Sequence, residues 1–166
     1  WKARRRTSWW TFPKCPMCLL HHADYFPCPT TTIMKLYAQK WKHSYGFSSG
    51  NCFYNYWYAK EHILKTGSVI LVEGPADVWR LEEAGYHNSL AIFGVSLSDR
   101  QKIILETSGA MNVFLFFDPD KAGENVTEKV EKELSHMYNV KRILSDKEPG
   151  DLNILEIKER LSFICK

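Results

Sequence analysis

From residue 68 onward, short apolar runs alternate with stretches in which apolar and charged residues recur at helical spacing. This alternation is typical of a parallel β-sheet whose strands are joined by crossover helices. The strands are predicted at residues 69–72, 90–93, 113–117 and 140–144, and the helices at residues 76–84, 98–107, 122–135 and 152–161. The order βαβαβαβα predicts an α/β domain over residues 68–166, with a mostly parallel, Rossmann-like sheet and flanking helices.

Residues 1–67 have a less regular pattern and are predicted to form a second, smaller part of the chain. Helices are expected at residues 32–42 and 56–64, and residues 65–67 make only a short join to the α/β domain. Residues 1–60 hold nine Lys and Arg against one acid, a net charge of +8, whereas the remaining thirteen bases and eighteen acids give −5. Many aromatic residues accompany these bases, which favours contact with nucleic acid; an aromatic core with a solvated rim is the alternative.

Acidic residues follow two of the predicted strands directly. Glu73 comes after the first strand, and Asp118 and Asp120 come after the third. The carboxyl ends of parallel strands meet at one edge of the sheet, where ligands of such sheets bind, so these carboxylates are expected to converge. Carboxylate oxygens select Mg²⁺ or Mn²⁺, which bridge to substrate phosphates, so phosphoryl transfer is the expected chemistry.

The same acids also have a structural interpretation, since Asp and Glu often end strands and cap helices. The joint spacing, Glu73-Gly74-x-x-Asp77 and Asp118-x-Asp120-x-x-Gly123, favours a site over isolated caps. Gly74 and Gly123 would let phosphate or backbone approach closely. Asp77 stays open between a metal ligand and a residue that satisfies the first turn of its helix.

These two segments, Val72-Glu-Gly-Pro-Ala-Asp77 and Phe116-Phe-Asp-Pro-Asp-Lys-Ala-Gly123, resemble the Toprim family over about residues 68–155. The turn at residues 91–98 and the segment at residues 53–61 are similar to those of bacterial primases of the DnaG type. The resemblance implies that Asp118 and Asp120 are the principal metal ligands, and that Glu73 is a general base or metal contact near an attacking 3′-hydroxyl.

Residues 146–152 resemble a Lys-Asp-Pro stretch that supplies a further metal-site acid in those primases. Here Glu148 stands in place of the usual Asp. Either Glu148 reaches the metal, or Asp151 is the ligand or the N-cap of the last helix. Lys121 beside the acids is a candidate to neutralise a triphosphate, with a solvated helix residue as the alternative; the same choice applies to Arg80.

Cysteines suggest a second metal site in the N-terminal part. Cys15-Pro-Met-Cys18 has the spacing that places two thiolates on Zn²⁺, and Cys28 would be a third ligand. The fourth ligand stays open, and reduced, buried cysteines are the alternative. If residues 30–67 are a reduced polymerase half of a primase, Lys42 and Asn55 are among the residues expected to face template or nucleotide; an unrelated binding module is the alternative for this stretch.

The leading functional hypothesis is therefore a DNA primase, or its catalytic part, making RNA primers from nucleoside triphosphates on single-stranded DNA, with a replicative helicase as a further partner. The alternatives are a Toprim nuclease and a non-catalytic DNA-binding scaffold resembling RecR. Neither a run of 18 apolar residues nor an N-terminal secretory pattern occurs, so no membrane association is expected. The expected location is the cytoplasm of a bacterial or phage-infected cell, and the short N-terminal part favours phage.

Overall fold

The computed structural model describes residues 45–164. Contacts divide the chain into two compact units, and the unit described here begins at Ser48. Its elements in chain order are η2 (Ser49–Asn51), α2 (Tyr56–Thr66), β1 (Ser68–Val72), α3 (Pro75–Glu83), β2 (Ser89–Ala91), α4 (Asp99–Glu106), β3 (Asn112–Leu115), α5 (Lys121–Leu134), β4 (Asn139–Arg142), η3 (Pro149–Asp151) and α6 (Ile154–Arg160). The helix expected at residues 32–42 lies outside the described residues.

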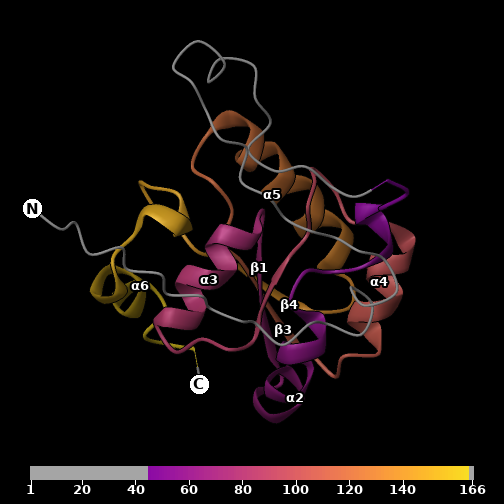
Figure 1. Ribbon diagram of the computed structural model, residues 1–166, viewed down its shortest axis with the longest axis horizontal. Coiled ribbons are helices and arrows are strands. Elements are labelled where there is room, and N and C mark those ends of the chain that lie inside the picture. The colour runs from indigo at the N-terminus through magenta and orange to yellow at the C-terminus, as the bar shows by residue number, and fades with distance from the viewer. Residues whose placement is uncertain (1–44, 165–166) are drawn as a thin grey trace, which may run out of the picture. The chain divides into compact units, whose positions relative to one another are not determined.

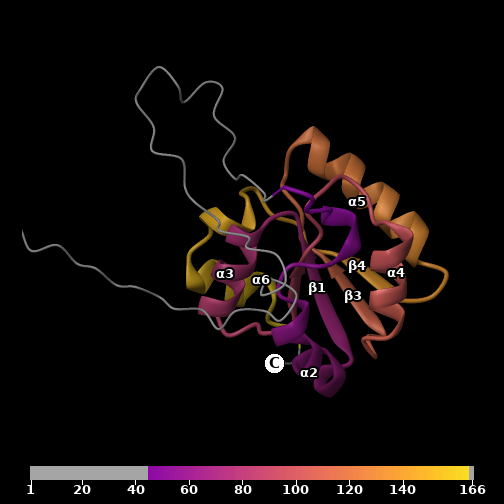
Figure 2. The same ribbon diagram turned by 45° about the vertical axis from the view of Figure 1, so that its right-hand side comes forward.

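The four strands form one parallel sheet in the order β2-β1-β3-β4, which confirms the predicted α/β class. Successive side chains of a strand point to opposite faces, so each face of β1 meets a different set of helices. Helices α3 and α6 cover one face, and α4 and α5 cover the other (Figures 1 and 2). None of the helices within residues 45–164 is long and apolar enough to cross a membrane.

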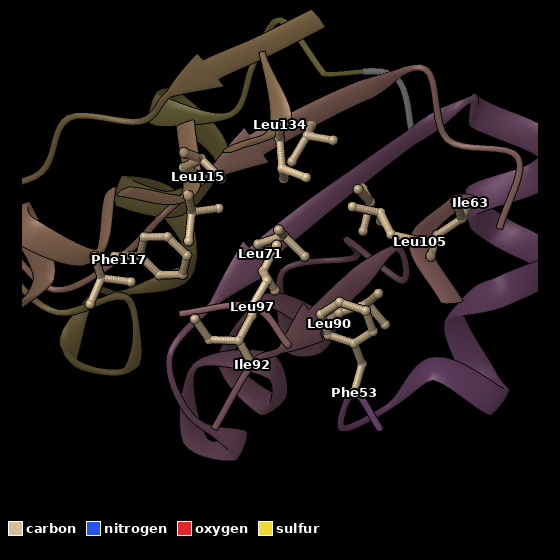
Figure 3. Close-up of a cluster of buried hydrophobic side chains, with 14 of the residues drawn as sticks. Phe53, Ile63, Leu71, Leu90, Ile92, Leu97, Leu105, Leu115, Phe117 and Leu134 are labelled. Atoms are coloured by element: carbon tan, nitrogen blue, oxygen red, sulfur yellow. The ribbon is translucent and has the colours of Figure 1, made fainter. Parts of the chain in front are cut away.

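Two hydrophobic clusters, one on each face, hold these layers together. The cluster under α2, α4 and α5 includes Leu71, Leu90, Leu105, Leu115 and Leu134, whose side chains meet in Figure 3. The cluster under α3 and α6 takes the alternate strand residues, with Ile70, Val72 and Phe116 against helix residues such as Leu81 and Ile157. The middle strand β1 is buried along its whole length. Glu73 is the first residue after it, so the backbone of Glu73 is anchored by the hydrophobic core.

Strand β3 ends earlier than the apolar run predicts. Pairing stops at Leu115, whereas the run continues to Phe117. Phe116 N still donates to Leu71 O at 2.9 Å. Beyond that point the chain of β1 turns away at Gly74 to start α3, so β3 has no strand left to pair with there. Phe117 remains buried and leads into Asp118.

The segment from Ser48 to Gly67 packs against the sheet, although the sequence pattern groups it with the N-terminal part. Tyr54 makes an isolated antiparallel bridge to Ala91 at the end of β2. Gln101, buried on α4, donates its amide to Cys52 O at 2.9 Å, Ile92 O at 3.0 Å and Ser49 O at 3.4 Å. One buried amide therefore ties the segment that precedes β1 to the loop after β2.

Replacing Gln101 by Leu is expected to lower the free energy of unfolding by about 2–3 kcal/mol, because the buried carbonyl of Ile92 and the partly buried carbonyls of Ser49 and Cys52 lose their donor. Urea unfolding of the two proteins measures the difference. Asp99→Asn, on the same helix with a fully exposed side chain, is the control and should change stability by less than about 0.5 kcal/mol. Equal stability of Gln101→Leu and the parent would show that this amide does not hold the segment.

Candidate active site at the carboxyl ends of β1 and β3

The structure brings Glu73 and Asp118 together at the edge of the sheet where β1 and β3 end. Glu73 follows β1 directly, and its Oε1 accepts a hydrogen bond from Asp118 N at 3.4 Å. Both side chains are half-buried. The parallel pairing of β1 and β3 is the reason, since it places the ends of the two strands side by side. The convergence predicted from the sequence is observed for this pair.

Gly123 lets the start of α5 approach these two acids. A Cβ at residue 123 would overlap the backbone oxygen of Asp118 and lie 2.8 Å from Glu73 Oε1. No side chain larger than hydrogen fits without moving backbone atoms. Gly123 therefore serves the close packing of α5 on Glu73 and Asp118, as the sequence suggests, and not a turn with positive φ.

Asp118 carries the most unusual electrostatics of the site. Its Oδ1 is buried and, within the part of the chain that the structure describes, has no hydrogen-bond partner. Burial, followed by the negative charges of Glu73, Asp77, Glu148 and Asp120, raises the pKa of Asp118 to about 7. A buried carboxylate oxygen without a partner is unfavourable, so the arrangement favours binding of either a proton or a cation.

Glu73 shares this environment. Burial is the main cause that raises the pKa of Glu73, and the charges of Asp120, Asp77 and Glu148 act in the same direction. The hydrogen bond from the backbone of Asp118 opposes them by stabilising the ionised form. The negative charges of Asp77, Asp120 and Glu148 thus act on both Glu73 and Asp118, and this repulsion is the property that a divalent cation would relieve.

Asp120 is exposed and is the N-cap of α5. Its Oδ1 accepts a hydrogen bond from Gly123 N at 2.7 Å. The capping alternative raised by the sequence therefore holds for this residue, but it leaves the second carboxylate oxygen available for a ligand. Lys121, the first residue of α5, is exposed beside it, and the position suits an anion at the helix N-terminus.

Asp77 lies deeper than the other acids, with only 7% of its surface exposed. Its Oδ2 accepts from Gly74 N and its Oδ1 from Gly150 N, each at 3.0 Å. Glu148, two residues before Gly150, is exposed, and its charge acts on both Glu73 and Asp118. The structure thus places Glu148 near the acids, as the resemblance implies, and gives Asp77 backbone partners on two loops.

Several other predicted residues have different surroundings. Asp151 is exposed, and it is not the N-cap of the last helix, because Asn153 accepts from Leu155 N and Glu156 N at 2.9 Å and starts α6. Asn55 starts α2 and donates to Ser89 O and Glu82 Oε1, both at 3.2 Å, so its amide lies at the beginning of β2 and not among the acids. Gly74 joins β1 to α3, and an added Cβ there would meet only an ordinary contact at 3.6 Å.

The predicted zinc ligands Cys15, Cys18 and Cys28, and the predicted nucleotide contact Lys42, lie outside the described residues. Within residues 45–164, no three Asp, Glu, His or Cys side chains are already placed to hold a metal ion together. Mg²⁺ commonly binds proteins through one or two carboxylates and completes its shell with water and substrate phosphate. The residues present fit that mode, because Asp118 has a buried oxygen without a partner and its carboxylate is close enough to Glu73 for the charge of Glu73 to raise the pKa of Asp118.

The raised pKa of Asp118 predicts a pH-dependent stability of the metal-free protein. Below pH 3.8 the Asp118 carboxyl is protonated in both the folded and the unfolded protein. As pH rises from 3.8 to about 7, the unfolded protein loses this proton first, so the folded protein becomes less stable relative to it. A shift of about three units corresponds to roughly 4 kcal/mol, which partial exposure reduces to about 1–3 kcal/mol. With EDTA present, stability relative to Asp118→Asn should fall between about pH 4 and pH 8. Urea unfolding across this range measures the difference, and a constant difference would contradict the raised pKa.

Arg80 and Gly150 are residues whose structural partnership the sequence did not reveal. Arg80 Nε donates to Gly150 O at 3.3 Å, and Arg80 Nη1 pairs with Glu83 Oε2 at 2.7 Å, so the guanidinium is engaged within the fold. The sequence does not indicate a special role for Gly150, because a glycine between Pro149 and Asp151 is equally typical of an ordinary turn.

Comparisons with known proteins agree with this geometry. The family model described as "Toprim domain" matches residues 67–144. The chain is 39% identical over 83 residues to the DNA primase of Helicobacter pylori, covering 50% of this chain and 15% of that protein. It is 40% identical over 97 residues to the DNA primase DnaG of Pyrobaculum aerophilum, covering 58% of this chain and 23% of that protein. The chain therefore spans less than a quarter of either relative.

Solved structures show the same fold. The zinc-binding and RNA polymerase domains of the Aquifex aeolicus primase align with a TM-score of 0.63 at 24% identity, over 78% of this chain and 34% of that one. A DnaG primase catalytic domain bound to single-stranded DNA aligns with a TM-score of 0.61 at 18% identity, over 79% of this chain and 45% of that one. Together with the matched sequence at residues 67–144, the parallel sheet and the acids at its edge show that this chain carries a Toprim domain related to those of DnaG-type DNA primases.

Proposed function

We propose that this chain is a DNA primase or the catalytic part of one, which joins nucleoside triphosphates into short RNA primers on single-stranded DNA. The observation that carries the proposal is the buried, partnerless oxygen of Asp118 among four other carboxylates, at the sheet edge where parallel sheets bind their ligands. The sequence relatives named DNA primase and DnaG support the choice of reaction, and the aligned catalytic domain bound to single-stranded DNA supports the choice of template.

The proposed cofactor is Mg²⁺ or Mn²⁺, which when bound would neutralise the substrate phosphates and the repulsion among the acids. Asp118 is the proposed main ligand, through its partnerless oxygen, and Asp120 contributes the carboxylate oxygen that does not cap α5. Glu148 is a further candidate on the opposite loop. In the reaction, the 3′-oxygen of the growing primer forms a bond to the α-phosphorus of the incoming nucleotide, and pyrophosphate leaves.

Glu73 is the proposed acceptor of the proton that leaves the 3′-hydroxyl. Burial and the neighbouring acids raise the pKa of Glu73, which makes its carboxylate a better base than an exposed glutamate. Lys121, exposed at the N-terminus of α5, would meet the triphosphate at the positive end of that helix. A zinc site at Cys15, Cys18 and Cys28 and a helicase partner stay predictions from the sequence.

Primer synthesis tests the proposal. The full chain is incubated with single-stranded DNA, labelled nucleoside triphosphates and Mg²⁺ or Mn²⁺, and the products are separated by length. Short labelled oligomers that require both template and metal are the expected result. Metal-dependent degradation of labelled template without oligomers would assign the site to a nuclease instead, and template binding without any turnover would favour a scaffold.

A further inference from the structure

Two residues of α3 hold the peptide groups of Gly150 from both sides. Asp77 Oδ1 accepts from Gly150 N at 3.0 Å, and Arg80 Nε donates to Gly150 O at 3.3 Å. Residues three apart on a helix lie on the same face, so α3 presents an acceptor and a donor side by side to the loop at Gly150. We call this arrangement of Asp77, Arg80 and Gly150 the α3 clamp.

The α3 clamp also reaches the loop that follows Glu73. The second oxygen of Asp77, Oδ2, accepts from Gly74 N at 3.0 Å, and Gly74 is the neighbour of Glu73 in the chain. With only 7% of its surface exposed, the Asp77 side chain is fixed between the two loops. A Cβ at residue 150 would lie 3.0 Å from Asp77 Oδ1, so the close approach favours glycine there.

The loop at Gly150 carries Glu148 on a short rigid turn. Pro149 is buried, and Asp151 N donates to Glu148 O at 3.0 Å, which closes the 3₁₀ turn η3. Because Gly150 belongs to this turn, fixing its peptide groups also fixes the backbone of Glu148. The charge of Glu148 acts on Glu73 and Asp118, and the α3 clamp holds the turn from which this charge is presented.

We propose that Asp77 and Arg80 are positioning residues that hold Glu148 at the acidic site, and that Asp77 acts through Gly150 and not as a ligand of the cation. The inference rests on the proposed cation site at Asp118. Of the two roles that the sequence leaves open for Asp77, the structure shows the one in the first turn of α3, where Oδ2 accepts from Gly74 N, and the inference replaces the metal-ligand role. For Arg80 it replaces the phosphate contact, because Nε donates to the carbonyl of Gly150.

Mn²⁺ affinity, measured from the electron paramagnetic resonance signal of free Mn²⁺, separates a positioning role from a ligand role. Asp77→Asn keeps the size of the side chain but replaces one carboxylate oxygen by an NH₂ group, which donates and does not accept. The variant can therefore accept a hydrogen bond from Gly74 N or from Gly150 N, but not from both. We expect this variant to weaken Mn²⁺ binding about 10-fold, as is typical when a residue that orients a ligand is lost. Arg80→Met should weaken it in the same direction, although Arg80 cannot bind a cation itself.

A double-mutant cycle with Glu148→Gln gives the decisive comparison. If Asp77 acts by placing Glu148, then adding Asp77→Asn to Glu148→Gln should change Mn²⁺ affinity by less than about 2-fold. A full 10-fold further loss would make Asp77 a direct ligand and overturn the inference, as would unchanged affinity in Arg80→Met. Unchanged affinity in Asp118→Asn would instead reject the proposed cation site itself.

Hydrogen exchange provides a readout that needs no metal. The Gly150 amide should exchange at least about 10-fold faster in Asp77→Asn than in the parent, while core amides of β1 keep their protection. Glu83→Gln is the matched control, because it removes the exposed ion-pair partner of Arg80 and leaves the α3 clamp intact. Unchanged Gly150 protection in Asp77→Asn would show that the α3 clamp does not hold this loop.

Discussion

An Asp118→Asn variant is expected to lose primer synthesis by at least about 100-fold while resisting urea better than the parent at pH 8 without divalent cations. Asn keeps the size of the side chain but removes one charge from a cluster whose members raise the pKa of Asp118 to about 7. Loss of a metal ligand removes several kcal/mol of charge stabilisation in the transition state, and each 1.36 kcal/mol is a factor of ten in rate. Activity and stability should therefore change in opposite directions.

The control for this variant is Asp99→Asn, which removes an acid from the first turn of α4, where the side chain is fully exposed. Both measurements should stay near the parental values. Adding Mn²⁺ should raise the unfolding midpoint of the parent and of the control, but not that of Asp118→Asn. An Asp118→Asn protein that keeps its synthesis rate would remove Asp118 from the site.

Gly123→Ala is expected to lower the free energy of unfolding by about 3 kcal/mol and to abolish cation binding at the acids. In a helix far from other atoms the same change stabilises by up to about 1 kcal/mol, so helix propensity predicts the opposite sign. Here the new Cβ overlaps the backbone of Asp118 and lies 2.8 Å from Glu73 Oε1. The start of α5 must then move away, which separates the two acids as well as the packed surfaces.

Gly74→Ala is the matched control for the stability measurement. Gly74 has a φ of −127°, which any residue adopts, and its nearest new contact would be 3.6 Å away. We expect Gly74→Ala to change the free energy of unfolding by less than about 0.5 kcal/mol in the same urea titration. Equal effects of the two substitutions would mean that the close approach at Gly123 is not what holds α5 against the sheet.

The parts of the fold that the sequence predicts are those set by a repeating pattern. The apolar run 69–72 is long and β-branched enough to indicate a buried central strand, and β1 is buried throughout. Once the strands are parallel, the position of Glu73 and Asp118 at one edge follows from topology alone. Other properties of these two acids, such as the absence of a hydrogen-bond partner for Asp118 Oδ1 in the described residues, depend on the packing of several elements and cannot be predicted from the residue type.

Contacts between residues far apart in the chain are the parts that the sequence could not give. Asn55 looked like a nucleotide contact, but its amide bonds to Ser89 O across a separation of 34 residues. Asp77 does satisfy the start of its own helix through Gly74 N, which is one of the two roles that the sequence leaves open, but its other partner Gly150 lies 73 residues away. Asp151 and Asn153 are equally good N-caps by residue type, and only the geometry at Leu155 and Glu156 selects Asn153.

Paramagnetic broadening by Mn²⁺ tests the cation site most directly. Mn²⁺ is titrated at substoichiometric amounts into the ¹⁵N-labelled chain, and amide signals are followed by NMR. The signals of Glu73, Asp118, Asp120 and Glu148 should broaden first, and Asp118→Asn should abolish this selectivity. Early broadening confined to exposed acids elsewhere, with these four signals unchanged, would contradict a cation site at the carboxyl ends of β1 and β3.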